Sequence, residues 1–272
     1  NKYDEFVIKK DGLHRGKGVY VQNNDFDNNL ESIESLDLGS STLIVEEKLY
    51  GEEYSLMSLV DYGNNIVHFP PIRDYKRLEN NNLGCNTGGM GCVIDANNTL
   101  PFLTKEDITT SQEINEIIIQ KCNNNLGNYR GILYGSFIKT AKGIKIIEYN
   151  CRFGDPESII GLNLLKNNFY TICMDFCDGN LKSLDFSQNA SICVYVVPKT
   201  YCRQSEKHNK YDLYFNENLE NEITYSNIEI LDNHFYSLNS RCFAITISSN
   251  NLYNCYQKIY NKLSNINGYI HY

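Results

Sequence analysis

Two oxygen-bearing side chains stand at the end of an apolar segment, IKIIEYN, at residues 144–150. Glu148 and Asn150 are two positions apart, so in a strand they share one face, about 6.6–7 Å apart along it. A carboxylate and an amide oxygen are hard ligands that suit Mg²⁺, which completes its octahedron with water and phosphate. The pair predicts a metal site; the alternative is a solvated strand end at which Asn150 begins a turn.

The next segment, CRFGDPE at residues 151–157, adds a cation and two acids. Arg152 carries the planar fork that binds a carboxylate or an acyl phosphate. Asp155 either faces such a ligand or caps the helix that Pro156 and Glu157 are expected to begin. On this segment alone, a substrate site and a plain strand-to-helix turn both remain open.

A glycine-rich segment near the start, DGLHRGKGV at residues 11–19, has the composition of a phosphate-binding loop. Its backbone N–H groups and the ammonium of Lys17 could approach phosphates, and Lys9 lies two positions before Asp11. It is not a Walker A loop, because no Ser or Thr follows Lys17 and a strand comes next. The alternative is a flexible hairpin turn with a surface lysine. The glycines concerned are Gly12, Gly16 and Gly18.

Two more segments combine polar or flexible residues with strand ends. In VEEKLYGEEY, residues 45–54, backbone groups could read an adenine edge and Glu53 could reach a ribose hydroxyl; the alternative is a solvated acidic turn. GCNTGGMG, residues 84–91, has four glycines in eight positions. So much backbone freedom is costly unless the chain approaches a ligand closely or turns sharply.

The periodicity of the rest of the chain predicts the scaffold that must position these side chains. A tight turn is expected within residues 60–67, and a second one at Lys142 and Gly143. Strands are expected at 5–10, 18–22, 42–49, 53–61, 65–70, 91–95, 131–140, 143–150, 190–198, 228–232, 235–238 and 241–248. Helices are expected at 28–36, 104–122, 155–177 and 251–266.

Composition excludes some classes of function. The formal net charge is −8 and the 25 basic residues are scattered, which argues against a nucleic-acid surface. No apolar run reaches the ~18 residues of a membrane span, and no signal-peptide pattern is present, so we expect a cytoplasmic protein without membrane contact. The ten cysteines lie singly, which predicts buried free thiols in a reducing compartment.

In this order and spacing, the segments closely resemble the phosphoribosylamine–glycine ligases (glycinamide ribonucleotide synthetases) of the ATP-grasp superfamily. KKDGLHRGKGV stands for the family's K-A-D-G-L-A-A-G-K-G-V, and EEKLYGEE for E-E-F-L-x-G-E-E. PPIRDYKR stands for P-P-x-Q-D-H-K-R, NTGGMG is unchanged, and EYNCRFGDPE stands for E-F-N-C-R-F-G-D-P-E. The resemblance covers nearly the whole chain and thins after residue 190, where LNSRCFAIT stands for N-G-G-R-V-L-x-V-T.

The resemblance implies an enzyme of purine synthesis, which joins glycine to 5-phosphoribosylamine at the expense of ATP. Glycyl phosphate would be the intermediate, and glycinamide ribonucleotide, ADP and phosphate the products. Glu148 and Asn150 would hold Mg²⁺ or Mn²⁺, and Arg152 and Asp155 would act in catalysis. The implied ATP-binding residues are Lys9, Gly12, Gly16, Lys17, Gly18, Glu46, Glu47, Leu49 and Glu53. The implied substrate-binding residues are Asp74, Lys76, Arg77, Asn86, Thr87, Gly88, Gly89, Met90 and Gly91.

The fold implied is an α/β (α+β) ATP-grasp fold in three parts. Residues 1–45 would form a lid subdomain, 46–188 the core with the metal and substrate site, and 189–272 a C-terminal α+β domain. The partners implied are the small molecules ATP, glycine and 5-phosphoribosylamine. Further purine-pathway domains in the same chain are compatible with the resemblance.

Several positions depart from the family pattern. Arg73 and Tyr75 replace Gln and His, and His14 and Arg15 replace two small lid residues. Arg15 could help to grip phosphate, whereas Arg73 could disturb substrate recognition. The family's N-terminal G-x-G-G-R-E-H loop and the R-x-D-I-G that follows GYIHY have no match, so we expect the chain to be part of a longer protein.

Two alternatives remain open. One is another ATP-grasp ligase that joins a different acid and amine. The other is a truncated nucleotide-binding module without turnover.

Overall fold

The computed structural model describes residues 5–12, 18–21, 42–125, 127–202, 210–214, 222–232 and 234–272. The helix expected at 28–36 lies outside these residues, as do Gly16 and Lys17 of the glycine-rich segment and the departures His14 and Arg15.

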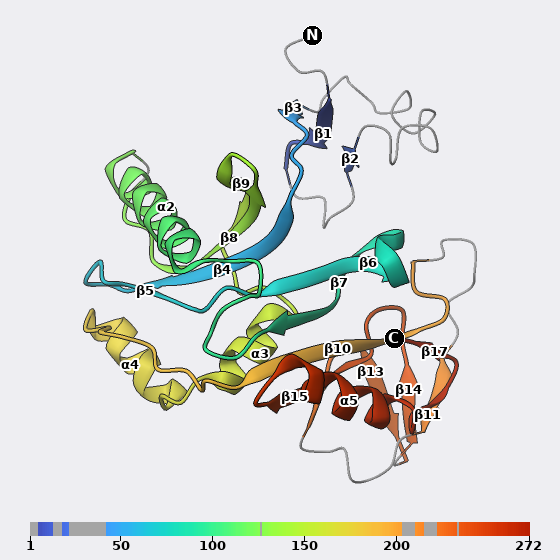
Figure 1. Cartoon of the computed structure of the whole chain (residues 1–272). Helices are drawn as coiled ribbons and strands as arrows, with labels where there is room; N and C mark the ends of the chain where they lie inside the picture. Colours follow the sequence, from blue (N-terminus) through green and yellow to red (C-terminus); the bar gives the residue numbers. More distant parts are fainter. Residues whose placement is uncertain are drawn as a thin grey trace.

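A small antiparallel sheet contains the first three described strands, in the order β2-β1-β3. Their bounds are Phe6–Lys10 for β1, Val19–Val21 for β2 and Leu43–Glu47 for β3. The backbone N–H of Lys10 donates to the carbonyl of Gly18 at 2.9 Å, which brings the two ends of the glycine-rich segment together. This sheet lies at one end of the molecule, beside β9 (Figure 1).

A second antiparallel sheet, in the order β5-β4-β8-β9, carries the predicted metal pair. Its strands are β4 (Glu52–Val60), β5 (Ile66–His68), β8 (Gly131–Thr140) and β9 (Gly143–Asn150), and both turns fall where the sequence predicts them. Helix α2 (Lys105–Asn125) packs on this sheet. Its N-terminus is held by Thr104, whose backbone N–H and hydroxyl both donate to Asp107, while the N–H of Asp107 donates back to the hydroxyl.

The third sheet runs across the expected boundary between residues 188 and 189. Its order is β12-β15-β10-β7-β6, with β17 paired to β10. Its strands are β6 (Arg73–Glu79), β7 (Leu83–Ile94), β10 (Ala190–Pro198), β12 (Ile223–Tyr225), β15 (Phe243–Ser249) and β17 (Ile270–His271); the short 3₁₀ helix η1 (Asn80–Asn82) joins β6 to β7. Strand β7 pairs with β10 from Gly91 opposite Val194 to Ile94 opposite Ser191. The division into three parts stays a prediction.

A fourth sheet and a helix complete the C-terminal part. The sheet has the order β13-β14-β11-β16, with β11 (Tyr211–Tyr214), β13 (Ile228–Leu231), β14 (His234–Ser237) and β16 (Asn267–Gly268). Helix α5 (Leu252–Leu263) packs on β10 and β15. Its N-cap is Asn251, whose side chain accepts from the N–H of Asn254.

The single helix expected at 155–177 is wrong, because the chain forms two. Helix α3 (Glu157–Leu164) and helix α4 (Phe169–Asp178) are separated at Leu165, which forms a β-bridge with Phe186. Asn168 caps α4 by accepting from two backbone N–H groups. Asparagine side chains compete with helical hydrogen bonds in this way, and the apolar spacing alone does not reveal it.

The largest buried clusters flank the third sheet. One lies between this sheet and α5; the other lies between it, α3 and the second sheet, and includes Met57, Cys92, Ile160 and Cys193. All ten cysteines are free thiols, as expected, but only four are buried and five are exposed. Among the described residues, no helix combines the length and apolar character needed to cross a membrane.

Candidate active site

The predicted metal pair lies where β9 ends. Glu148 and Asn150 share a face, and the amide of Asn150 donates to Oε1 of Glu148 at 3.2 Å. The register between β8 and β9 shifts just before them, because Ser136 opposes Glu148 whereas Phe137 opposes Ile146. Ile147 is therefore the extra residue of a β-bulge, at which the ladder between β8 and β9 is locally disrupted.

Lys9 connects the small sheet to that bulge. Its ammonium donates to the carbonyl of Ile147 at 3.0 Å and pairs with Oε2 of Glu46 at 2.6 Å. The structure thus brings two predicted ATP-binding residues, Lys9 and Glu46, to the residue that precedes Glu148. Gly12, Gly18, Glu47 and Leu49 lie at the ends of strands of the same sheet or just beyond them.

A glycine is required where β4 begins. A Cβ on Gly51 would lie 2.0 Å from the carbonyl oxygen of Lys139, so any other residue would push β4 away from β8. This explains the glycine in the LYGEE segment without a ligand, and it places Glu52 and Glu53 at the start of β4, opposite Lys139 and Ile138 of β8.

A second group of predicted residues forms an ion-paired cluster on one face of β6. The ammonium of Lys76 lies 3.1 Å from Glu53 and 2.9 Å from Asp74. Burial alone would lower the pKa of Lys76, but the two carboxylates outweigh it and raise that pKa above its ordinary value. Lys76 is therefore a permanent cation that joins a predicted ATP-binding residue to a predicted substrate-binding residue.

Glu157 is a buried acid that interacts electrostatically with Asp74 and Lys76, and the sequence predicted for it only a place at a helix start. It is 3% exposed, and Oε1 accepts from the hydroxyl of Tyr134 at 2.6 Å. Burial and the charge of Asp74 raise the pKa of Glu157. Its place two residues after Asp155 in a functional motif was the only signal in the sequence that could have identified it.

The glycine-rich strand β7 is paired rather than looped. Thr87 donates to the carbonyl of Lys76 at 2.9 Å and accepts from the N–H of Gly89 at 3.0 Å, while Asn86 opposes Arg77. Met90 and Gly91 are buried, whereas Asn86 and Gly88 are exposed. Only the first part of the NTGGMG segment therefore faces solvent, where a substrate would approach.

Arg152 and Asp155 point to different partners. Arg152 is exposed and donates to the carbonyl of Phe153 at 2.9 Å. Asp155 does not cap α3, whose N-cap is Pro156 without a side-chain hydrogen bond. Instead, its carboxylate accepts from Tyr195 at 2.8 Å and from Arg241 at 2.7 Å, two residues of the C-terminal part for which no role was predicted.

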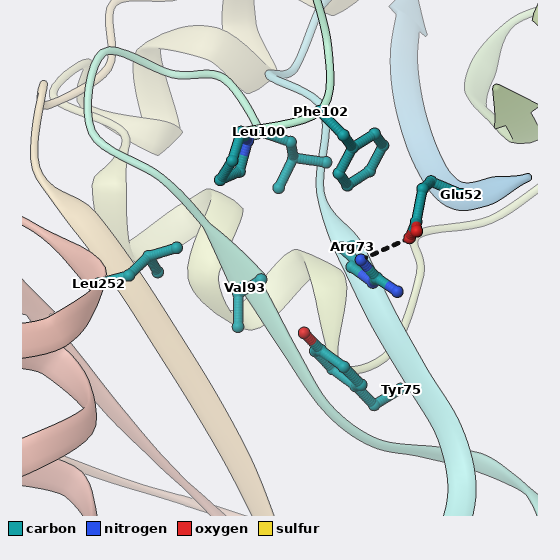
Figure 2. A pocket seen from close by; sticks show the side chains of 8 residues that line it. Glu52, Arg73, Tyr75, Val93, Leu100, Phe102 and Leu252 are labelled. Atoms are coloured by element: carbon teal, nitrogen blue, oxygen red, sulfur yellow. Dashed lines mark ion pairs between the residues drawn. The ribbon is translucent and has the colours of Figure 1, made fainter. Parts of the chain in front are cut away.

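The departures Arg73 and Tyr75 lie on the other face of β6, because alternate residues of a strand point to opposite faces. Arg73 pairs with Glu52 at 2.7 Å, and its guanidinium lies over the rings of Tyr75 and Phe102. Figure 2 shows these side chains around a cavity of about 340 Å³ that Leu252 of α5 also lines. Arg73 is thus directed away from Asp74 and Lys76, and the disturbance of substrate recognition that it could cause stays a prediction.

Comparisons with known proteins identify the family of the chain. The family model described as phosphoribosylglycinamide synthetase, ATP-grasp (A) domain, matches residues 1–158, more than half of the chain. A phosphoribosylamine–glycine ligase of Methanococcus maripaludis is 35% identical over 98% of this chain and 62% of its own. One of Methanothermobacter thermautotrophicus is 35% identical over 92% of this chain and 59% of its own. The chain spans about three fifths of the length of these relatives.

Solved structures confirm the predicted fold class. The phosphoribosylamine–glycine ligase of Thermotoga maritima has a TM-score of 0.83 at 25% identity, over 98% of this chain and 67% of that one. An N5-carboxyaminoimidazole ribonucleotide synthetase of Thermotoga maritima shares the fold with a TM-score of 0.62 at 13% identity, over 97% of this chain and 62% of that one. The chain belongs to the phosphoribosylglycinamide synthetase family and carries its ATP-grasp domain.

Proposed function

We propose that this chain contains the catalytic core for the ATP-dependent ligation of glycine to 5-phosphoribosylamine, with glycinamide ribonucleotide, ADP and phosphate as products. The observation that carries the proposal is the meeting of Lys9 and Glu46 with the strand that ends in Glu148 and Asn150. A cation, a carboxylate expected beside the adenosine and a pair of oxygen ligands then follow one another in space. The parts of a nucleoside triphosphate site have this arrangement.

The donor set at the end of β9 fits a hard divalent cation. Glu148 is exposed, and its carboxylate and the amide of Asn150 are close enough to share a hydrogen bond. Mg²⁺ or Mn²⁺ bound there would neutralise phosphate charge and take its other ligands from phosphate and water. The two side chains would hold and orient it.

The remaining residues would act by position and charge. Lys9 would meet the phosphates from the small sheet, with Gly12 and Gly18 shaping the segment that follows it. Arg152, which is exposed, would bind the glycine carboxylate. Asp74, Lys76 and Glu53 would face the sugar amine and the ribose of the nucleotide, because Lys76 pairs with both carboxylates and so holds the three side chains of β4 and β6 together.

The reaction would proceed in two displacements. A carboxylate oxygen of glycine attacks the γ-phosphorus of ATP, and ADP leaves with its bonding electron pair. The amine of 5-phosphoribosylamine then attacks the acyl carbon of glycyl phosphate, phosphate leaves, and the amine loses a proton. Neither step needs a side-chain nucleophile, so positioning and charge neutralisation carry the catalysis.

Release of ADP tests the proposal most directly. The chain would be incubated with Mg-ATP, glycine and freshly generated 5-phosphoribosylamine, and each would be omitted in turn. Dependence on both co-substrates supports the ligase. Dependence on a different acid or amine would indicate another ATP-grasp ligase.

If no ADP forms, the N-terminal region of a relative would be supplied in trans. Recovery of glycine-dependent turnover supports the proposal for the longer protein. Mg-ATP binding without turnover, even then, would overturn it in favour of a nucleotide-binding module.

A further inference from the structure

Four carbonyl or carboxylate oxygens converge on one guanidinium in the turn before β15. Nη1 of Arg241 donates to the carbonyls of Gly88 at 2.9 Å, Gly89 at 3.0 Å and Asp155 at 3.0 Å. Nη2 donates to Oδ2 of Asp155 at 2.7 Å. The side chain is only 14% exposed. A single residue of the C-terminal part therefore ties the glycine-rich strand to the loop that follows the predicted metal pair.

Tyr195 of β10 completes the set of contacts. Its hydroxyl donates to Oδ1 of Asp155 at 2.8 Å, and its ring lies 4.4 Å from the guanidinium carbon of Arg241. Burial and the Asp155 carboxylate raise the pKa of Tyr195, so its hydroxyl keeps its proton and remains a donor. Both oxygens of Asp155 are thus held by the C-terminal part.

The glycines allow this close approach. Gly89 has φ of +112°, and a Cβ there would lie 2.7 Å from Cδ of Pro156. A Cβ on Gly88 would lie 3.3 Å from the guanidinium carbon of Arg241. The backbone of β7 therefore lies directly against Arg241 and the Asp155–Pro156 loop, with no side chain between them.

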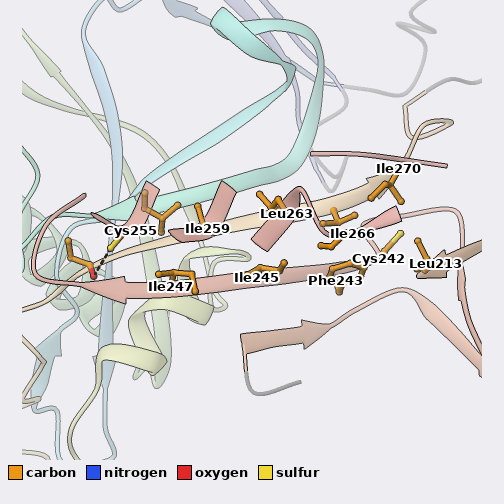
Figure 3. Close-up of a cluster of buried hydrophobic side chains, with 13 residues drawn as sticks. Leu213, Cys242, Phe243, Ile245, Ile247, Cys255, Ile259, Leu263, Ile266 and Ile270 are labelled. Atoms are coloured by element: carbon orange, nitrogen blue, oxygen red, sulfur yellow. Dashed lines mark hydrogen bonds between the residues drawn. The ribbon is translucent and has the colours of Figure 1, made fainter. Parts of the chain in front are cut away.

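The backbone of Arg241 is itself fixed. The two residues that follow it, Cys242 and Phe243, are fully buried in the cluster between α5 and the third sheet (Figure 3). The N–H of Cys242 donates to Val196 of β10 at 2.8 Å, and the carbonyl of Arg241 accepts from Asn227 at 3.0 Å. The guanidinium is consequently presented from a rigid part of the molecule.

From these contacts we propose that Arg241 is a positioning residue for the acid substrate. It would hold the exposed start of the NTGGMG strand and the Asp155 loop in the spacing at which glycine and the acyl phosphate bind. This rests on the function proposed above. Because ATP and the metal are assigned to other elements, loss of Arg241 would affect the acid substrate and the chemical step rather than nucleotide binding.

The test compares Arg241→Ala with Lys262→Ala, which removes a cation of the same C-terminal part that pairs with Glu222 away from the candidate site. We expect Arg241→Ala to lower kcat/KM for glycine by about 100-fold, in line with the effect of a small misplacement of reacting groups. The Kd of Mg-ATP should stay within about 2-fold of the wild-type value. Added guanidinium ion should restore part of the lost kcat/KM in Arg241→Ala, and Lys262→Ala should resemble the wild type.

Hydrogen exchange provides a readout that does not depend on turnover. Amides of residues 88–91 and 153–157 should exchange faster in Arg241→Ala than in Lys262→Ala. Unchanged exchange in both segments would overturn the positioning role. An equal loss of Mg-ATP affinity and of kcat/KM would overturn it too, because it would show general destabilisation. The wild-type chain could show no glycine-dependent turnover under any condition while the exchange difference is present. The proposed function then fails, whereas the role of Arg241 in holding the two segments together stands.

Discussion

At the scale of single residues, the carboxylates of the candidate site differ in the partners they already have. Glu46 pairs with Lys9, Glu53 and Asp74 pair with Lys76, and Asp155 is held by Arg241. Glu148 differs from these four, because it accepts a hydrogen bond from the neutral amide of Asn150. A divalent cation would therefore find uncompensated negative charge at Glu148 and compensated charge at the other four.

The substitution Glu148→Ala tests that distinction. We expect it to abolish Mg-dependent nucleotide binding while leaving the fold intact, since Glu148 is exposed at the end of a strand. Calorimetric titration with Mg-ATP gives the affinity, and Glu113→Ala, which removes the same charge from the exposed side of α2, is the control. Equal Mg-ATP affinity in Glu148→Ala and in the control would remove the metal assignment.

His68 gives the fold a dependence on pH. Its ring contacts Ser58 at 2.8 Å and Glu116 of α2 at 3.2 Å. Burial lowers the pKa of His68, and Glu116 offsets this only in part. The folded protein therefore holds this proton less tightly than the unfolded chain, so the stability contribution is complete above pH ~6.5 and is lost as pH falls toward the folded-state pKa.

We expect His68→Gln to flatten the change in unfolding free energy between pH ~7 and ~5. Urea unfolding at several pH values measures it, with exposed His234 replaced by Gln as the control. If the two variants show the same slope as the wild type, His68 does not govern this dependence.

At the scale of elements, turns and single strands were predictable because their signals are local. The turn between β4 and β5 falls within the expected residues 60–67, and Asp61 shows why. Its Oδ1 accepts from the backbone N–H of Gly63 and of Asn65, both at 2.8 Å, and Oδ2 accepts from Leu181 at 2.9 Å. Burial would raise the pKa of Asp61, but these hydrogen bonds outweigh it and lower that pKa.

Replacing Asp61 by Ala would leave three backbone donors without this acceptor, and the N–H of Leu181 among them is buried. We expect a loss of about 3 kcal/mol in unfolding free energy at neutral pH. Urea unfolding measures the loss, and Asp178→Ala at the exposed end of α4 is the control. A loss below about 1 kcal/mol would mean that water replaces the carboxylate.

Long-range pairing was less predictable than local structure. The break between α3 and α4 depends on Leu165 meeting Phe186, and strand β6 depends on its partner β7. Phe186 is distant from Leu165 in the sequence, and the pairing of β6 with β7 is irregular. The spacing of apolar residues therefore does not predict either pairing. The same applies to Arg241 and Tyr195, whose role depends on folding of the C-terminal part against Asp155.

At the scale of the whole molecule, the family and fold followed from long motifs, but the division at residue 188 did not anticipate a shared sheet. Strands β7 and β10 are paired in register, so cutting between residues 188 and 189 would expose an unpaired edge on each piece. We expect residues 1–188 and 189–272 to aggregate when produced separately and to form one complex when produced together.

Size-exclusion chromatography and thermal unfolding test this expectation on residues 1–188 and 189–272, produced separately and produced together. Cooperative unfolding of residues 1–188 alone would show that they form an independent unit, and it would support the expected domain boundary between residues 188 and 189. The matched control is a cut after Lys142, in the turn between β8 and β9, which leaves the β7–β10 pairing intact.

The bridge made by Lys9 has a consequence for nucleotide binding. Its ammonium already holds two oxygens, one on Glu46 and one on the bulge of β9. A phosphate that reaches Lys9 therefore competes with these partners, and by thermodynamic reciprocity the bridge weakens nucleotide binding by the same factor by which bound nucleotide weakens the bridge. Added salt weakens the internal ion pair, which favours ATP binding, and it also weakens the phosphate contact, which disfavours ATP binding. The two effects on ATP affinity therefore oppose each other. Titration of ATP at rising ionic strength should accordingly show a shallower loss of affinity in the wild type than in Glu46→Gln, where the competing charge is absent.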